Sequence, residues 1–191
     1  MAKQPTIFTV SNNDAYKIAF NEAESFFAAS RYVDEMLFKN VRFSEIKKFM
    51  GITLASEVNH CFAMEMYLKT LSIITKGSYI TGHPLDKLYD YLLPDVQNEL
   101  ISHFDLVHKY NDIDLSREVQ GLPPKEFNEL LIDAKDTFID NRYKFSQQEN
   151  SNGSYSSYKL DGAILTIREI IIKKHPELNQ LAFATIALKK R

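Results

Sequence analysis

Residues 44–75 read SEIKKFMGITLASEVNHCFAMEMYLKTLSIIT, and this stretch decides the fold class. Its apolar side chains recur at steps of three and four residues and cover more than one face of a helix. They are Leu54, Val58, Cys61, Phe62, Met66, Leu68, Leu71 and Ile73. Such a pattern is typical of a central helix contacted on several sides. Gly77 follows and suits the left-handed residue that ends a helix, so we expect the helix to end there.

The rest of the chain repeats the helical spacing. We expect helices over 14–37, from Pro84, from Pro94, over 124–145, over 160–175 and over 176–188. Residues 1–12 read as an irregular arm that includes a short extended piece, and 147–157 as a flexible polar loop. No β-type alternation of useful length interrupts this order. The sequence therefore predicts a single all-α domain over 1–191, an up-and-down helical bundle with an extra C-terminal helix.

Composition excludes several classes of protein. The net charge of -2 and the pI near 6.2 give no general attraction to nucleic acid, although a local RNA site stays open. The single cysteine, Cys61, excludes a disulfide framework and suits a reducing compartment. No apolar run reaches the roughly 20 residues of a membrane span, and no signal peptide is visible. We therefore expect a cytoplasmic protein with no membrane partner and no cofactor.

Charged residues on apolar stripes are the first candidates for a site. Arg142 continues the stripe of the 124–145 helix, where a guanidinium needs a carboxylate nearby. Glu65 and Lys69 lie four residues apart in the central helix, in the favourable order for an ion pair. We expect Glu65, Lys69 and Arg142 to form a ligand-binding or structural ion-pair group across the bundle. The alternatives are an arginine at the bundle's end and a solvated strip.

Arg168 and His175 are candidates for catalysis. They are seven residues apart, which places them on the same side of one helix after two turns. A histidine that moves protons and an arginine that stabilises charge on phosphorus could cleave RNA without a metal. The alternative for His175 is a helix-end cap, because Pro176 follows it.

The other histidines are weaker candidates for a functional site. His60 adjoins the apolar core and reads as a packed or surface residue, and His83 before Pro84 reads as a helix cap. His103 and His108 are five residues apart, a poor same-face spacing for metal ligands on an α-helix, and no carboxylate completes a set. We therefore expect no metal site.

Residues 62–69, FAMEMYLK, followed by 82–88, GHPLDKL, resemble the HEPN superfamily (higher eukaryotes and prokaryotes nucleotide-binding), whose helical domains show A-x-E-x-x-x-K-x-L and then H-x-L-x-x-L. Residues 138–143, FIDNRY, are similar to a later F-x-x-x-R-Y stretch. The resemblance covers about residues 50–175. It implies a bundle that often dimerises, sometimes cleaves RNA, and frequently belongs to bacterial toxin–antitoxin or phage-defence systems.

The chain departs from active HEPN members, which carry an arginine and a histidine separated by four to six residues. Only Arg168 and His175 meet this spacing, and Glu169 after the arginine is not the small polar residue usually found there. Residues 143–149 contain no histidine after Arg142. Our leading hypothesis is therefore a HEPN-like binding or dimerisation module without RNase catalysis. Its partners would be a second copy, an RNA or nucleotide, or an antitoxin protein. The alternatives are a ribonuclease that uses Arg168 and His175, and a small-molecule sensor with a pocket lined by Tyr67, Phe138 and Arg142.

Overall fold

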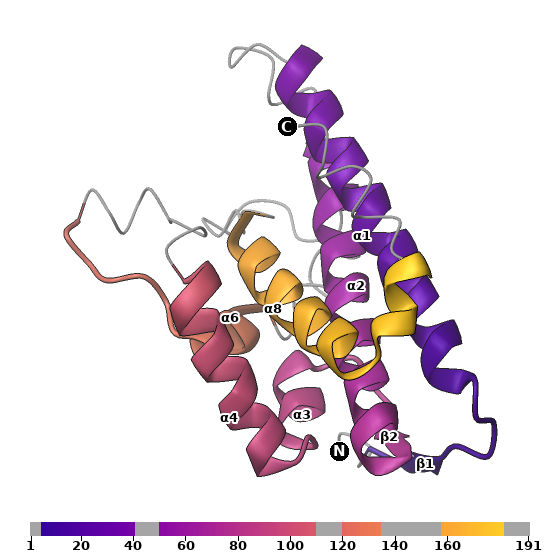
Figure 1. Cartoon of the computed structure of the whole chain (residues 1–191). Coiled ribbons are helices and arrows are strands. Elements are labelled where there is room, and N and C mark those ends of the chain that lie inside the picture. The colour runs from indigo at the N-terminus through magenta and orange to yellow at the C-terminus, as the bar shows by residue number, and fades with distance from the viewer. Residues whose placement is uncertain (1–4, 41–49, 110–119, 135–157, 182–191) are drawn as a thin grey trace.

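The structure is a computed structural model of the chain, and it describes residues 5–40, 50–109, 120–134 and 158–181 (Figure 1). These residues form six α-helices and one two-stranded sheet, which confirms the all-α prediction. The helices are α1 (Ala15–Asn40), α2 (Met50–Lys76), α3 (Leu85–Asp90), α4 (Pro94–His103), α6 (Phe127–Ala134) and α8 (Tyr158–Lys174). The remaining elements are β1 (Ile7–Thr9), β2 (Ser78–Ile80), a π-helix η2 (Phe104–His108) and a 3₁₀-helix η4 (Pro176–Leu181).

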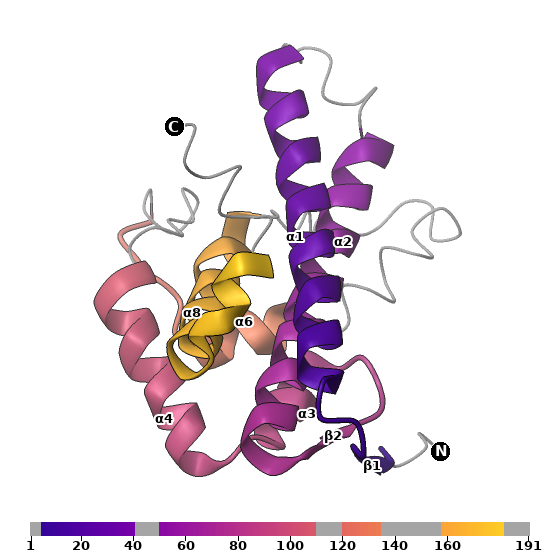
Figure 2. The ribbon, with the colours of Figure 1, turned by 45° about the vertical axis from the view of Figure 1, so that its right-hand side comes forward.

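The two long helices, α1 and α2, lie side by side and form one half of the molecule (Figures 1 and 2). Helix α8 crosses against α2, and α4, η2 and α6 cover its other side. The ends of α1 and α2 at Asn40 and Met50 extend beyond the other described helices (Figures 1 and 2). None of the described helices is long and apolar enough to cross a membrane.

Local sequence signals place the helix ends. The side chain of Asn12 accepts a hydrogen bond from the backbone N–H of Asp14 at 2.9 Å, next to the start of α1. Pro94 occupies the first turn of α4, where its missing N–H is not needed. Gly77 has a φ of 67° and ends α2, as expected from the sequence. The expected start of the central helix, at residue 44, lies outside the described residues.

The N-terminal arm contributes one strand of the small sheet. β1 confirms the expected extended piece, and it pairs antiparallel with β2, a strand that the sequence analysis did not predict. Phe8 lies opposite Tyr79, and their rings stack with centroids 5.9 Å apart. A three-residue strand is too short to show alternation, which explains why β2 was missed.

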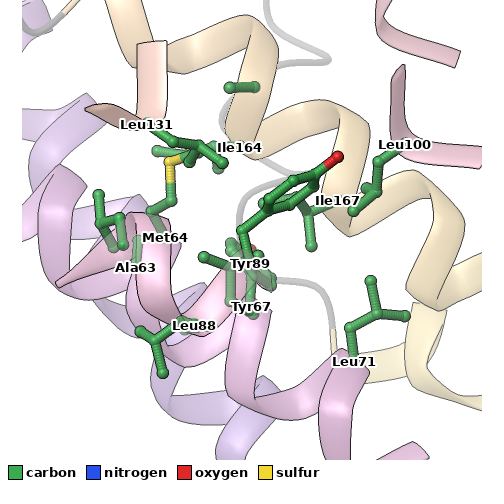
Figure 3. Close-up of a cluster of buried hydrophobic side chains, with 14 of the residues drawn as sticks. Ala63, Met64, Tyr67, Leu71, Leu88, Tyr89, Leu100, Leu131, Ile164 and Ile167 are labelled. Carbon is green, nitrogen blue, oxygen red and sulfur yellow. The ribbon is translucent and has the colours of Figure 1, made fainter. Parts of the chain in front are cut away.

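The core lies where α2, α8, α3, α4 and α6 meet (Figure 3). Its residues come from every α-helix, and Tyr67, Phe20, Phe27, Phe104 and Phe127 are the largest fully buried side chains. Cys61 belongs to this core, as expected, and burial raises the pKa of its thiol to about 12. The thiol therefore stays protonated and packs as a small apolar group.

Two expected helices are only partly described. Helix α6 lies within the 124–145 prediction, of which residues 135–145 fall outside the described residues. The last helix was expected from Pro176 to Leu188, and a helix does begin at Pro176, where residues Pro176–Leu181 form a 3₁₀-helix. Apolar spacing does not distinguish an α-helix from the tighter 3₁₀ form. Residues 182–188, like residues 147–157, lie outside the described residues.

Candidate functional site

Glu65 is the centre of a polar cluster on α2. One carboxylate oxygen accepts a hydrogen bond from Lys69 Nζ at 2.6 Å, and the other lies 2.8 Å from Nδ1 of His83. The side chains of Glu65 and Lys69 are 7% and 14% exposed, whereas His83 is 48% exposed. Glu65 and Lys69 therefore form the ion pair that their spacing in the sequence predicts. His83 contacts Glu65, and the interpretation of His83 as a helix cap stays a prediction.

Arg142, the third member of the expected group, lies outside the described residues, as does Phe138. The contact between Glu65 and Arg142 therefore stays a prediction. Tyr67, expected to line a sensor pocket, is fully buried, and its hydroxyl binds Glu24. A different, open pocket of about 230 Å³ lies between α1, α2 and β2, with Lys69 and Tyr79 in its wall.

Replacing Glu65 with alanine is expected to destabilise the protein by about 1–3 kcal/mol, because Lys69 loses a nearly buried partner. The loss would be measured by urea unfolding. A matched control is Asp90→Ala, which breaks an ion pair with Lys87 whose side chains are 63% and 59% exposed. The control should change stability by less than about 0.5 kcal/mol. Equal effects of the two variants would mean that the Glu65 cluster is a surface pair.

Arg168 points into the interior. Its Nε donates to Glu24 Oε1 at 2.5 Å, and the Tyr67 hydroxyl donates to the same oxygen at 2.6 Å. Arg168 is 7% exposed, and Glu24 and Tyr67 are fully buried. Burial and the negative charge of Glu24 raise the pKa of Tyr67 well above its usual value, so the phenol keeps its proton and remains a donor.

His175 has other partners. Its Nδ1 lies 2.8 Å from Glu177 Oε1, and the same oxygen accepts a hydrogen bond from Tyr16. The rings of His175 and Tyr16 lie 4.7 Å apart. Arg168 is thus held inside by Glu24, while His175 belongs to a more exposed group at the end of α8. This geometry does not favour a shared site for RNA cleavage.

A second buried polar group lies between the same three helices. Arg31 on α1 and His60 on α2 both bind Asp161 on α8, with 2.8 Å between His60 Nε2 and Asp161 Oδ1. Asp34 accepts a hydrogen bond from Ser56 at 2.6 Å, and burial raises its pKa. His60 is fully buried, which confirms its interpretation as a packed histidine.

The two groups form repeated layers along α1, α2 and α8. We call them the Glu24 layer and the Asp161 layer. On each helix the two members are seven residues apart, or two turns and about 10 Å. The pairs are Glu24 and Arg31 on α1, Tyr67 and His60 on α2, and Arg168 and Asp161 on α8. The charges of α1 and α8 are exchanged between the layers.

A third group joins η2 to α8. Nε2 of His103 and Nε2 of His108 lie 2.7 Å and 3.0 Å from the same oxygen, Oε2 of Glu169. The expectation that a five-residue spacing separates the two rings is wrong, because the chain forms a π-helix after His103, with Lys109 N–H bonded to the carbonyl of Phe104. Glu169 supplies the carboxylate that the sequence argument did not find. Within the described residues, one set of side chains could hold a metal ion, and it consists of His103, His108 and Glu169.

No known protein-family model matches the chain, and no curated protein or solved structure is significantly similar to it. Support for a function therefore comes from the contacts within the chain.

Proposed function

We propose that this chain is a HEPN-like helical module that pairs with a second copy of itself and does not cleave RNA. The observation that carries the proposal is the convergence of Glu65, Lys69 and His83. These residues are the acid, the lysine and the histidine of the two segments that resemble HEPN domains. Glu65 and Lys69 are one helical turn apart, whereas His83 comes from the second segment. Its contact with Glu65 supports a shared architecture rather than a chance match of letters.

The contacts of Arg168 support the absence of catalysis. A catalytic arginine must reach a phosphodiester, but this guanidinium is nearly buried and bound to Glu24. Moving it to a substrate would leave a carboxylate buried without its cation, which costs several kcal/mol. The remaining HEPN arginine is Arg142, and no histidine follows it at the required spacing.

Pairing of two copies is supported by the exposed apolar residues of α1. Tyr32 and Met36 are 67% and 46% exposed and lie four residues apart, so they share one face of the helix. Both lie in the C-terminal half of α1 (Ala15–Asn40), the helix that packs against α2. A twofold interface needs a face that can pack against itself, and an apolar helix face meets that requirement.

Light scattering after size-exclusion chromatography tests the pairing. We expect the mass of a dimer for the wild-type chain and a monomer for Tyr32→Ser/Met36→Ser. The matched control is Leu106→Ser, which removes an apolar side chain that is 85% exposed on η2 and should leave the dimer intact. A wild-type monomer at all accessible concentrations would contradict the proposal.

Incubation of the purified protein with single-stranded and structured RNA tests the absence of cleavage. We expect no products above a buffer control. Cleavage that disappears in Arg142→Ala would show that the chain is a ribonuclease and would overturn this part of the proposal. A toxin–antitoxin or phage-defence role would add a protein antitoxin or a nucleotide as a partner, and pull-down with products of neighbouring genes tests that role.

A further inference from the structure

We propose that His103, His108 and Glu169 form a binding site for one divalent metal ion of the zinc type. The three ligand atoms, two imidazole Nε2 atoms and one carboxylate oxygen, all lie within 4.8 Å of one another. They come from two separate parts of the chain, the α4–η2 segment and α8. An ion held there would cross-link these elements. The inference is independent of the proposed pairing of two copies.

The three ligand atoms are close enough for a local adjustment to bring them around one ion. Zinc lies about 2.0–2.2 Å from imidazole nitrogen and carboxylate oxygen, so neighbouring ligands of a tetrahedral ion are about 3.3 Å apart. The two nitrogens already lie 2.7 Å and 3.0 Å from Glu169 Oε2. Admitting the ion would move Oε2 of Glu169 away from both nitrogens by a few tenths of an ångström, and would bring the two nitrogens, which lie within 4.8 Å of each other, to about 3.3 Å apart. The side chain of Glu169 is 39% exposed and has room to make this adjustment.

The π-helix η2 exposes two apolar side chains and buries a histidine. In η2, Leu106 is 85% exposed and Val107 is 47% exposed, while His108 is turned inward and only 5% exposed. Nδ1 of His108 is buried without a hydrogen-bond partner among the described residues. Folding normally buries apolar side chains and gives buried polar atoms a hydrogen-bond partner. Leu106, Val107 and Nδ1 of His108 depart from these tendencies. Such departures concentrate at functional sites, where π-helical turns are also frequent.

The donor set indicates the class of ion. Two imidazoles and one carboxylate suit zinc and related transition metals, whereas calcium and magnesium prefer oxygen ligands throughout. His103 is 33% exposed, which leaves solvent access for a water molecule at a fourth position.

Isothermal titration of the chelator-treated chain with zinc chloride tests the site. We expect one ion per chain at micromolar or tighter affinity, and a melting temperature that rises with zinc concentration. His103→Asn and Glu169→Gln should each weaken binding by at least about tenfold, because each removes a ligand. Both positions are partly exposed, and circular dichroism would show that the variants remain folded.

The matched control is His175→Asn. His175 and Glu177 form another histidine–carboxylate pair at 2.8 Å, but this pair lacks a second imidazole. The control should bind zinc as the wild-type chain does. The proposal is overturned if the wild-type chain shows no saturable binding of one zinc, or if His103→Asn and Glu169→Gln bind as tightly as the wild type. It is also overturned if the His175→Asn control abolishes binding.

Discussion

Arg168→Met is expected to lower the free energy of unfolding by about 3–5 kcal/mol. The reason is that Glu24, which is fully buried, would lose the cation that its carboxylate binds. The Tyr67 hydroxyl would remain as a donor, but a neutral phenol compensates a buried carboxylate less well than a guanidinium does. Urea unfolding followed by circular dichroism measures the loss.

The double variant Glu24→Gln/Arg168→Met provides the control. It removes both charges and keeps similar side-chain volumes, so most of the lost stability should return. This recovery separates a structural ion pair from a merely disrupted core. A single Arg168→Met variant as stable as the wild type would show that Arg168 is free of Glu24, and the ribonuclease interpretation would regain support.

Asp161→Ala is expected to have a similarly large effect, about 3–5 kcal/mol. Asp161 is the shared acceptor of Arg31 and His60, and its removal takes this acceptor away from a partly buried guanidinium and a fully buried imidazole. Unlike the Glu65 cluster, this group connects three helices, so we expect a lower midpoint of a single cooperative unfolding transition. Thermal and urea unfolding of the same variant would measure it.

The matched control for Asp161 is Asp14→Ala. Asp14 pairs with Lys17 at 2.7 Å, but the two side chains are 64% and 42% exposed. Its replacement should therefore cost less than about 0.5 kcal/mol. If Asp161→Ala is equally mild, water must reach the Asp161 layer, and the buried network described above would be wrong.

The helices could be predicted because they depend on local spacing. The apolar steps of three and four located α1, α2 and α8, and Gly77 and Pro94 marked ends that need particular backbone angles. β2 could not be predicted, since its three residues gain their structure from pairing with β1, which is distant in sequence.

The buried charges were only partly recognised from sequence. Position 24 lies four residues after Phe20 and three before Phe27, so Glu24 sits on the apolar stripe of α1. The same test places Arg168 between Ile164 and Ile171. Glu24 and Arg168 could therefore have been recognised from sequence as charged residues on an apolar stripe, as Arg142 was. Their pairing could not be read, because it depends on how α1 and α8 meet in space.

The metal ligands were missed for a different reason. Spacing arguments for ligands on a helix assume α-helical backbone, in which residues five apart face different directions. The π-helix at Phe104–His108 changes this relation, and no local sequence rule predicts a single π turn. Glu169 comes from another helix and could not be assigned to His103 and His108 without the fold.

The exchange of charges between the Glu24 and Asp161 layers disfavours a displacement of α8 by two helical turns. Helices packed through apolar stripes alone can slide by whole turns with little loss of contact. Here, a slide of two turns in one direction would place Asp161 beside Glu24, and in the other direction Arg168 beside Arg31. Either error brings like charges together in the interior. The ion pairs therefore specify the register of α8. They disfavour bundles displaced by two turns, which apolar packing alone would tolerate.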